Sequence, residues 1–367
     1  MSEPEKVEGI VLIPGPSRKY LNERQLVAYK GHRKKYIKWL TRMGKDPEKL
    51  ERYAHDTARN YASITDKFYR WAWDHRGGYT LDLEHDDADE YLQEQVFSDD
   101  EYSGSHLHNV KFTLKAYFRF RNDIDEWESE ISISSPSGAT QPKDYVTMDE
   151  RKALREAVLE FGTVPAYAAL SPEKRSEWKR FLARRYGKPM NEVSKDDWDR
   201  TNGFKYSSIV HTSFDAGLRP IEVGRAKTYW VDVENAALRI PEDESSKNED
   251  NWTVILRHET AEYLARWLEE REMYDKYNDT DQLWLTRHSN PYSSSSLTYL
   301  IDSLCEIAEI DRSLSWYAIR HSTGTYMARE EDLAAAKSQL RHKSVETTMK
   351  YDQAPIEDRR NALDNMG

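Results

Sequence analysis

The sequence lacks two features that would assign it to whole classes of proteins: a set of cysteines and a long apolar run. Its 367 residues contain one cysteine, Cys305, which excludes an internal disulfide framework and a metal cluster built on several cysteines. We interpret Cys305 as a small buried apolar residue on a helix. No stretch approaches the roughly 18 consecutive apolar residues of a membrane span, and the polar N-terminus holds no signal-peptide core. We therefore expect a cytoplasmic protein without a membrane partner.

Repeats, low-complexity tracts and common cofactor motifs are also missing. The sequence shows no His/Cys spacing typical of zinc, no glycine loop that cradles phosphates and no dinucleotide fingerprint. We expect chemistry that needs neither a metal nor an organic cofactor. The length of 367 residues is enough for two domains with separate cores.

Acidic residues outnumber basic ones, by 65 to 54, but positive charge is concentrated in two runs. The net charge is −11 and the pI about 5.6, which argues at first sight against a nucleic-acid partner. Phosphate contact, however, needs a basic surface and not a basic average. Residues 30–45 carry seven basic residues and no acid, and residues 171–188 carry seven against two acids. Either run alone is best explained as a solvated helix face. As DNA-binding candidates the two runs offer Arg33, Lys34, Lys35, Lys38, Lys179, Arg180, Arg184 and Arg185.

Apolar periodicity predicts four helices in the first third of the chain. Residues 1–20 form a polar leader without periodicity. Helices are predicted at residues 23–43, 50–75, 87–95 and 105–121. On the last of them Lys111, Lys115 and Arg119 recur every four residues, which places three cations on one face. We expect residues 21–122 to form a four-helix bundle with one basic side.

A second domain follows a linker. Residues 123–145 are rich in serine and proline, as is typical of linkers. Thr147 and Glu150 form a capping-box pattern that predicts the start of a helix. Helices continue to about residue 216, and strands are predicted at residues 229–233, 237–240 and 252–256. Helices return at residues 259–274 and persist to the end. We expect a mainly α domain with a small three-stranded antiparallel sheet at residues 146–355, followed by a polar tail at residues 356–367.

Three short motifs in this domain carry side chains suited to phosphate chemistry. The first is Asp215-Ala-Gly-Leu-Arg219-Pro-Ile-Glu222, and the second is Tyr317-Ala-Ile-Arg320-His321. The third is Leu340-Arg341-His342, with Tyr351 nine residues after the histidine. A guanidinium group presents a planar fork to two phosphate oxygens and stays charged at any working pH. Two arginines, a histidine and a late tyrosine are what is needed to hold a phosphodiester and attack it with a phenolate.

The order and spacing of these motifs resemble the catalytic domain of the tyrosine recombinases, the phage integrase family. The resemblance covers roughly residues 146–355, and the N-terminal part resembles the family's SAM-like core-binding domain in architecture only. It implies that Tyr351 is the nucleophile, that Arg219 and Arg320 clamp the phosphate, and that His342 hydrogen-bonds the phosphate or the tyrosine oxygen. Glu222 lies one turn from Arg219 and is expected to orient it. Each of these residues alone could have a purely structural role, such as a surface arginine paired with glutamate or a packed tyrosine. The matching order and spacing of all of them favour a catalytic role.

Two positions leave alternatives open. Tyr317 stands where the family usually has histidine, and a phenol donates a hydrogen bond but is neither a cationic donor nor a base near neutral pH. An accessory catalytic role and simple packing are both open for it. Lys247 lies in the polar turn between the second and third predicted strands, where the family carries a lysine that protonates the leaving 5′-oxygen. Because acids surround Lys247 in this turn, a solvated turn residue is the alternative.

The resemblance implies site-specific DNA recombination, by integration or excision, through a 3′-phosphotyrosyl intermediate. It implies a homotetramer on double-stranded DNA that carries specific recombination sites, and a nucleoid-associated location in the cytoplasm. One alternative is a type IB topoisomerase-like nicking-closing enzyme. Another is a non-catalytic DNA-binding regulator derived from a recombinase, for which Tyr317 is the main support. The acid-rich remainder of the sequence would suit a salt-rich cytoplasm, and a haloarchaeal virus, plasmid or host is a hypothesis for the source.

Overall fold

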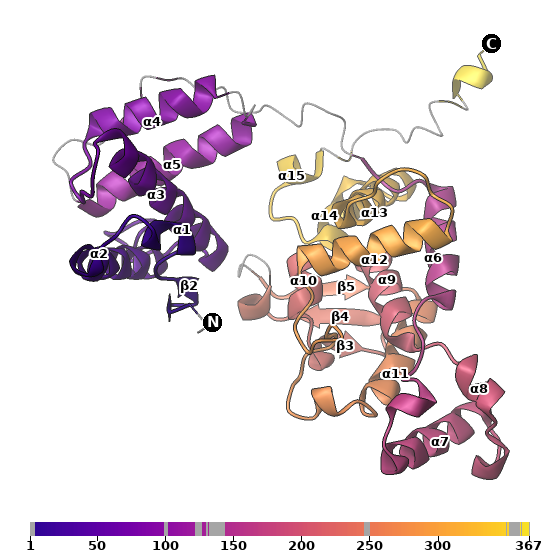
Figure 1. Ribbon diagram of the computed structural model, residues 1–367. Helices are drawn as coiled ribbons and strands as arrows, with labels where there is room; N and C mark the ends of the chain where they lie inside the picture. The colour runs from indigo at the N-terminus through magenta and orange to yellow at the C-terminus, as the bar shows by residue number, and fades with distance from the viewer. Residues whose placement is uncertain are drawn as a thin grey trace. The chain divides into compact units, whose positions relative to one another are not determined.

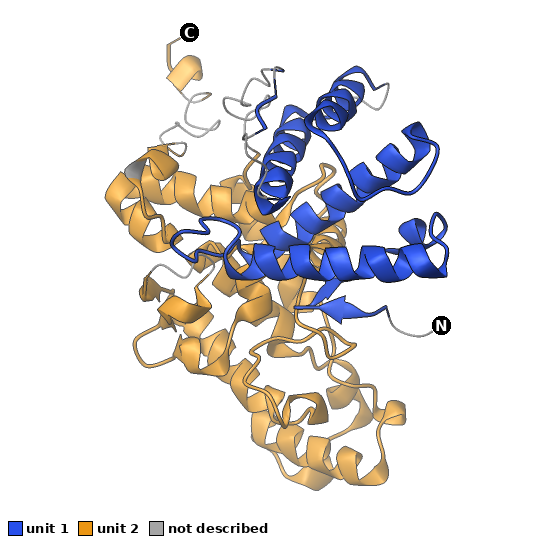
Figure 2. Ribbon diagram, turned by 90° about the vertical axis from the view of Figure 1, so that its left-hand side faces the viewer, with its two compact units in different colours: residues 1–141 blue, residues 142–367 orange. Residues whose placement is uncertain are grey.

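The chain folds into two compact units, each with its own hydrophobic core. The computed structural model (Figure 1) describes residues 4–98, 102–121, 127–129, 131, 144–245, 250–349, 351, 360 and 362–366. Unit 1 comprises residues 1–141 and unit 2 residues 142–367 (Figure 2). The boundary between them falls within the predicted linker at residues 123–145, most of which lies outside the described residues.

Unit 1 holds four long helices around an aromatic core. They are α2 (Glu23–Arg42), α3 (His55–His75), α4 (His85–Phe97) and α5 (Gly104–Arg121). Tyr36, Phe68 and Tyr117 are buried between them. The four helices match the four predicted segments, with α3 starting five residues later than predicted. The reason is a turn closed by a bridge between Asp46 and Glu51, which delays the helix.

The first residues of unit 1 differ from the expected polar leader. Strand β1 (Lys6–Val7) pairs antiparallel with β2 (Ile10–Val11), and the short helix α1 (Gly15–Arg18) follows. Ile10, Leu12 and Ile13 are buried in the core of unit 1. Two strands of two residues each are too short to show the alternation that predicts a strand, so the sequence does not reveal this hairpin.

Arg33 of α2 corrects one of the DNA-binding predictions. Its side chain is only 2% exposed, and its guanidinium donates to the carbonyl oxygens of Leu12 (2.6 Å) and Ala62 (2.9 Å). It also lies 3.6 Å from the buried carboxylate of Asp66. The prediction that Arg33 contacts DNA is therefore wrong, because its hydrogen-bonding groups face the core. The neighbouring Lys34 and Lys35 are exposed.

The three predicted cations of α5 lie at or near the surface, and each has a partner. Lys111 donates to the carbonyl oxygen of Ile131 (3.0 Å), and Lys115 forms an ion pair with Glu128 (2.5 Å). Arg119 is exposed and contacts the carbonyl oxygen of Lys45 at 3.5 Å. The contacts of Lys111 and Lys115 fasten the segment after α5 to the helix, and that of Arg119 reaches the turn after α2. The four-residue spacing alone does not predict these structural roles.

Unit 2 is mainly helical and carries one small antiparallel sheet. Strands β3 (Val231–Asp232), β4 (Ala237–Ile240) and β5 (Trp252–Ile255) pair in sequence order, with Leu238 opposite both Val231 and Val254. The prediction of a mainly helical fold with a three-stranded antiparallel sheet is confirmed. Helix α6 (Met148–Glu160) starts after Thr147, whose capping box with Glu150 is formed as predicted.

Helix α9 (Phe204–Ala216) lies at the centre of unit 2. It packs against α6, α11 (His258–Arg271), α13 (Trp316–Glu330) and β5. Residues 207–214 of α9 are all buried, since their side chains are apolar or small and polar apart from His211. The remaining helices of unit 2 are α7 (Pro172–Tyr186), α8 (Lys195–Asp199), α10 (Pro220–Arg225), α12 (Ser294–Ile307), α14 (Leu333–Leu340) and α15 (Val345–Met349). Short 3-10 turns occur at Tyr167–Ala169, Met190–Glu192, Thr228–Trp230, Glu242–Glu244 and Asp275–Tyr277.

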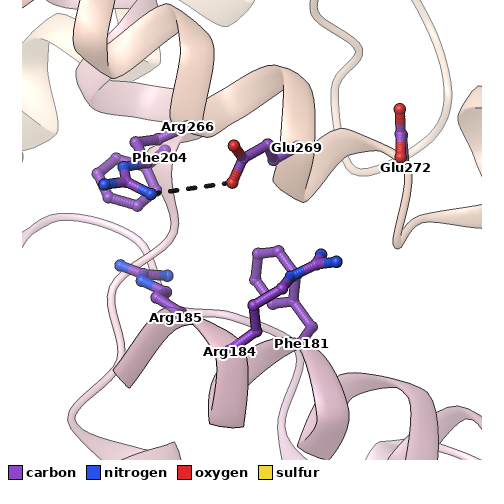
Figure 3. A pocket seen from close by; sticks show the side chains of 7 residues that line it. All are labelled: Phe181, Arg184, Arg185, Phe204, Arg266, Glu269 and Glu272. Carbon is purple, nitrogen blue, oxygen red and sulfur yellow. Dashed lines mark ion pairs between the residues drawn. The ribbon is translucent and has the colours of Figure 1, made fainter. Parts of the chain in front are cut away.

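Helix α7 carries the second basic run beside a satellite core that contains Trp178 and Trp198. Arg180 and Arg184 are exposed and Lys179 is half-buried. Arg185 is half-buried because its guanidinium lies over the ring of Phe204 (4.3 Å) and donates to the carbonyl oxygen of Asn202 (2.9 Å). A cavity of about 400 Å³ opens beside these residues (Figure 3). Its lining consists of Phe181, Arg184, Arg185, Phe204, Arg266, Glu269 and Glu272.

Within the described part of the chain, none of the helices combines the length and the apolar character needed to cross a membrane.

The burial of Arg33 predicts its effect on stability. Arg33→Gln should lower the free energy of unfolding by about 3–5 kcal/mol, since the buried carboxylate of Asp66 would lose a cationic partner and two buried carbonyls would lose their donor. The exposed neighbour gives the control, because Lys34→Gln should change it by no more than about 0.5 kcal/mol. Denaturant unfolding of wild type, Arg33→Gln and Lys34→Gln measures both changes in the free energy of unfolding. Equal effects of the two substitutions would contradict the structural role of Arg33.

Candidate active site

The turn after α9 carries the first arginine of the predicted set. Helix α9 ends at Gly217 in the left-handed conformation (φ +55°), and a Cβ at this position would lie 2.4 Å from Leu340. Only glycine satisfies both conditions. Arg219 then caps α10, and its guanidinium donates to Glu222 Oε1 at 2.9 Å. The backbone N–H of Arg219 donates to Glu222 Oε2 at 2.7 Å. The predicted contact between Arg219 and Glu222 is therefore present.

Arg320 of α13 meets this turn from the opposite side. It is 2% exposed, and its Nη1 donates to the carbonyl oxygen of Gly217 at 2.5 Å. Its Nη2 donates to the carbonyl oxygen of Leu340 (2.5 Å) and to His342 Nε2 (2.9 Å). Burial and the neighbouring cations Arg341 and Arg219 lower the pKa of Arg320 to about 9, so it remains a cation at neutral pH.

The contacts of His342 define its tautomer. A guanidinium only donates, so Nε2 must accept the hydrogen bond from Arg320. The proton of the neutral ring then lies on Nδ1, which is 3.0 Å from Thr348 Oγ1. In this state His342 is a neutral imidazole with a hydrogen bond at each ring nitrogen.

Tyr351 packs into the same cluster. Its ring stacks on that of His342, with the ring centroids 5.7 Å apart and the planes within 5° of parallel. The ring of His321 is tilted against the Tyr351 ring, with centroids 5.6 Å apart. The side chain is 3% exposed. Burial raises the pKa of Tyr351 above the usual 10.0, although the charges of Arg320 and Arg219 and a hydrogen bond from Arg320 oppose this. The phenol is therefore protonated in the DNA-free protein at neutral pH.

Tyr317 and Lys247 remain less defined than the other predicted residues. Tyr317 is 46% exposed in the first turn of α13, one turn before Arg320, with its ring 6.4 Å from that of His321. Such exposure does not fit a residue that only fills the core. Lys247 lies outside the described residues. A cavity of about 370 Å³ lies beside His342, and its lining includes Asp250 and Trp252.

Arg341 belongs to the cluster although its sequence context gave no reason to select it. Its side chain is 2% exposed, and its Nη2 donates to Glu222 Oε2 at 2.7 Å. Burial opposes ionisation of Glu222, but the charges of Arg341, Arg219 and Arg320 hold the pKa of Glu222 down at about 2. A basic residue directly after a helix is usually solvated, so nothing in the sequence distinguishes Arg341.

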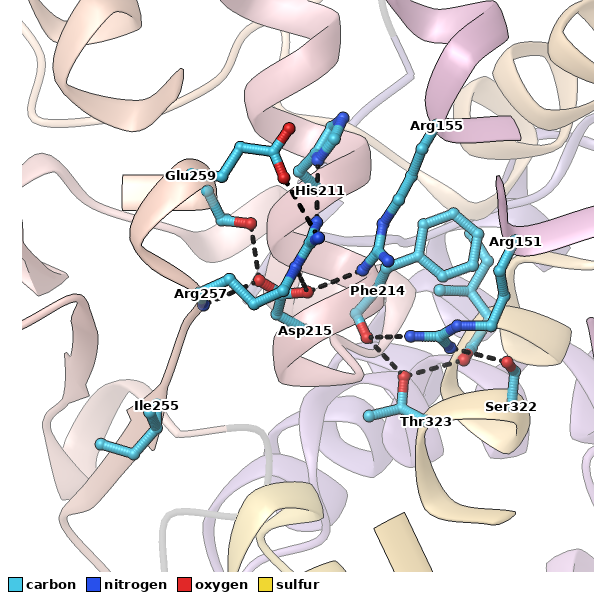
Figure 4. Close-up of polar contacts among 12 residues, drawn as sticks. Arg151, Arg155, His211, Phe214, Asp215, Ile255, Arg257, Glu259, Ser322 and Thr323 are labelled. Atoms are coloured by element: carbon cyan, nitrogen blue, oxygen red, sulfur yellow. Dashed lines mark hydrogen bonds and ion pairs between the residues drawn. The ribbon is translucent and has the colours of Figure 1, made fainter. Parts of the chain in front are cut away.

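Asp215 fixes the end of α9 from the outer side (Figure 4). Its carboxylate accepts hydrogen bonds from Arg155 (2.8 Å), the backbone N–H of Arg257 (3.0 Å) and Thr260 (2.6 Å). Arg151 donates to the carbonyl oxygen of Phe214 at 3.2 Å and to Ser322 Oγ at 2.6 Å. These contacts connect α9 to α6, α11 and α13, which carry or support the predicted site. No group of three or more His, Cys, Asp or Glu residues suited to a metal ion occurs among the described residues.

The sequence profile of the phage integrase family matches residues 187–356. That range contains Arg219, Arg320, His342 and Tyr351, which the structure brings together in one buried cluster. Residues 187–356 of this chain carry the sequence pattern of the phage integrase family. Tyrosine recombinase XerD of Staphylococcus aureus is 25% identical over 157 residues, which cover 42% of this chain and 52% of the relative. The XerD of Staphylococcus epidermidis is 24% identical over the same length. The chain thus spans about half the length of the curated relatives it matches.

Solved recombinase structures share the fold of this chain. The XerH site-specific recombinase bound to its difH substrate has a TM-score of 0.53 at 16% identity, covering 93% of this chain and 88% of that chain. The Tn1549 transposon integrase in complex with transposon right end DNA also has a TM-score of 0.53, at 15% identity, covering 90% and 99%. These likenesses concern the fold alone.

The depressed pKa of Glu222 in this site predicts a pH effect on stability. Its folded-state pKa of about 2 lies below the ordinary 4.5, so the stabilisation is fully present above pH 4.5 and is lost as the pH falls toward 2. A shift of this size corresponds to about 3 kcal/mol. Glu222→Gln removes the titrating group, so the wild-type advantage in unfolding free energy should shrink by that amount across this window. Glu262→Gln, at an exposed position, is the control. A difference in unfolding free energy between wild type and Glu222→Gln that stays constant with pH would contradict the low pKa of Glu222.

Close packing around Gly324 predicts a second effect. A Cβ at this position would lie 2.7 Å from Leu340 and 2.9 Å from two ring carbons of Tyr351. Gly324→Ala should therefore displace the Tyr351 ring and cost about 1–3 kcal/mol of stability through overpacking. Fluorine NMR of fluorotyrosine-labelled protein detects the displacement, with the signal assigned by Tyr351→Phe. Gly31→Ala, where no atom lies within 4 Å of the new Cβ, is the control, and an unmoved Tyr351 signal in Gly324→Ala would refute the packing.

Proposed function

We propose that this chain performs site-specific DNA recombination and that Tyr351 is its nucleophile. One observation carries the proposal: Tyr351, His342, Arg320 and Arg219 come from segments up to 132 positions apart yet form one buried cluster. The family pattern of residues 187–356 supports it, since similar proteins are tyrosine recombinases and two share their fold with this chain as DNA complexes.

The chemistry is a transfer of one phosphoryl group between two oxygens. Tyr351 Oη gives up its proton, for which His342 Nε2 is the proposed acceptor, and attacks the phosphorus. The bond from phosphorus to the 5′-oxygen breaks, and a 3′-phosphotyrosyl link forms. The 5′-oxygen leaves as a hydroxyl after taking a proton, for which Lys247 is the proposed donor. A 5′-hydroxyl from another strand then reverses the step, and no external energy source is needed because the link retains the bond energy.

The cations supply electrostatic stabilisation. The attacked phosphorus passes through a pentavalent state with increased negative charge, and Arg219 and Arg320 are proposed to stabilise it. Removal of one preorganised donor of this kind costs about 3–4 kcal/mol of activation free energy in comparable sites. Tyr317 is proposed to add a neutral hydrogen bond to a phosphate oxygen, since its phenol is exposed one turn before Arg320.

DNA binding is proposed to involve both units and several copies of the chain. The exposed Lys34 and Lys35 of unit 1 and the exposed Arg180 and Arg184 of unit 2 are the proposed phosphate contacts, with Lys38 and Lys179 beside them. Unit 1 would act as the core-binding domain, and a tetramer on specific recombination sites would exchange the strands. The tail at residues 356–367 is proposed to pack on a neighbouring protomer, because Leu363 and Met366 are 64% and 75% exposed.

Trapping a covalent complex tests the proposal. The protein is incubated, at low and at molar salt, with sheared and nicked genomic DNA from its source, and protein-linked DNA is recovered and sequenced. Wild type should yield an adduct through a tyrosine, and Tyr351→Phe should yield none while binding DNA with unchanged affinity, because only the attacking oxygen is missing. Recovered fragments that share one sequence identify the recombination site.

Other outcomes favour the alternatives. An adduct with fragments of any sequence, together with relaxation of supercoiled DNA by monomers, would favour a topoisomerase-like enzyme. Retained DNA binding without an adduct at any salt concentration would favour a non-catalytic DNA-binding protein.

A further inference from the structure

Arg341 adopts a backbone conformation that is unusual for its residue type. It is the C-cap of α14 with φ +58° and ψ +49°, in the left-handed region. This region costs a non-glycine residue about 1–2 kcal/mol. Glycine would avoid that cost, and at Arg341 the contacts of the side chain offset it.

The guanidinium of Arg341 joins three separate segments of the site. Its Nη2 donates to Glu222 in α10 at 2.7 Å, and its Nη1 donates to the carbonyl oxygens of Ala216 in α9 (2.7 Å) and Gln339 in α14 (2.9 Å). Its Nη2 also lies 3.4 Å from the carbonyl oxygen of Gly217. Arg341 and His342 follow each other in the turn after α14. The contacts of Arg341 therefore fix this turn to the turn that carries Arg219.

The charges of the cluster give these contacts a consequence for the phosphate. Arg219, Arg320 and Arg341 surround the one carboxylate of Glu222, so three positive charges and one negative leave an excess of two. Glu222 Oε1 accepts from the guanidinium of Arg219, and Glu222 Oε2 accepts from Arg341 Nη2 and from the backbone N–H of Arg219. A phosphodiester carries one negative charge and the pentavalent state two, which matches the excess. Without Arg341, a buried carboxylate would cancel more of the field of the two arginines.

We propose that Arg341 is a positioning residue of this site, which holds Glu222 and the end of α9 so that the charge of Arg219 and Arg320 is directed to the DNA phosphate. The inference rests on the proposed function, since the phosphate is that of the DNA strand attacked by Tyr351. Arg341 acts through Glu222 and does not itself touch the reacting atoms.

A set of four variants separates this role from backbone strain and from folding. Arg341→Gly removes the guanidinium and suits the left-handed backbone. Arg341→Lys keeps the positive charge but loses the planar set of N–H donors that contacts several acceptors at once. The double variant Arg341→Gly/Glu222→Gln also removes the carboxylate charge. Glu309→Gly is the matched control, because Glu309 is exposed and has φ +54°. The probe is a nicked duplex of the fragment recovered with wild type, and DNA affinity and the single-turnover rate of adduct formation are measured.

Arg341→Gly should slow adduct formation by on the order of 10- to 100-fold with DNA affinity within about twofold, because misdirected charge affects the reacting state more than binding. Arg341→Lys should fall between this variant and wild type, and Glu309→Gly should match wild type. The double variant should react several-fold faster than Arg341→Gly, since the uncompensated carboxylate is gone. A double variant that reacts no faster than Arg341→Gly, or an unchanged rate in Arg341→Gly, would overturn the proposal. If Arg341→Gly does not fold, Arg341→Lys decides: an unchanged rate overturns the proposal and a reduced rate at unchanged affinity supports it.

Orthovanadate binding distinguishes failure of this inference from failure of the proposed function. Vanadate can adopt the five-coordinate geometry of the attacked phosphorus and needs no DNA. Its binding to wild type and Arg341→Gly is measured by calorimetry. If wild type forms no adduct but binds vanadate at least about tenfold more tightly than Arg341→Gly, the proposed function fails and the role of Arg341 stands. An equal affinity, or no binding by either protein, would overturn the role of Arg341.

Discussion

The C-terminal end of α9 is the constraint on which the rest of the site depends. The last four carbonyl groups of a helix have no partner within it, and here the side chains of the site supply the partners. Phe214 accepts from Arg151 and Thr323, Asp215 from Gln339, Ala216 from Arg341, and Gly217 from Arg320. Positive groups at a helix C-terminus are also favoured by about 0.3–1 kcal/mol each. The same contacts that complete the helix therefore place two guanidinium groups at one point.

This arrangement explains how a protein of net charge −11 can hold a strongly positive site. The buried positive groups are stabilised by backbone carbonyls and by Glu222, and neither source cancels their charge completely. Water is largely excluded from the cluster, since Arg320, His342 and Tyr351 are each at most 3% exposed. Charges act more strongly in such surroundings than in water. The overall acidity of the chain is thus irrelevant to the field at Tyr351, and only the local set of arginines matters.

Sequence reasoning predicted the parts of this structure that leave a repeating or spaced pattern. The helices of unit 1 were found from apolar stripes, and the start of α6 from the capping box at Thr147. The contact between Arg219 and Glu222 follows from their spacing. Arg33 was misassigned, because a cation within a basic run looks like its exposed neighbours, and only the fold shows that it faces Leu12 and Asp66. Arg341 was overlooked for the same reason, since its partners Ala216 and Glu222 lie more than 100 positions away.

The tautomer of His342 limits what this residue can do when DNA binds. A phosphate oxygen is a charged acceptor and forms a stronger hydrogen bond with a guanidinium than a neutral imidazole does. Arg320 would therefore exchange its bond to His342 Nε2 for one to the phosphate. Nδ1 keeps its proton toward Thr348, so Nε2 then has a lone pair and no proton to give. A neutral His342 in this state can accept the proton of the Tyr351 phenol, whose pKa burial has raised, but it cannot donate a hydrogen bond from Nε2 to the phosphate. In the proposed reaction, the contact with Thr348 thus favours proton acceptance by His342 over a hydrogen bond to the phosphate, the two roles that the family resemblance leaves open.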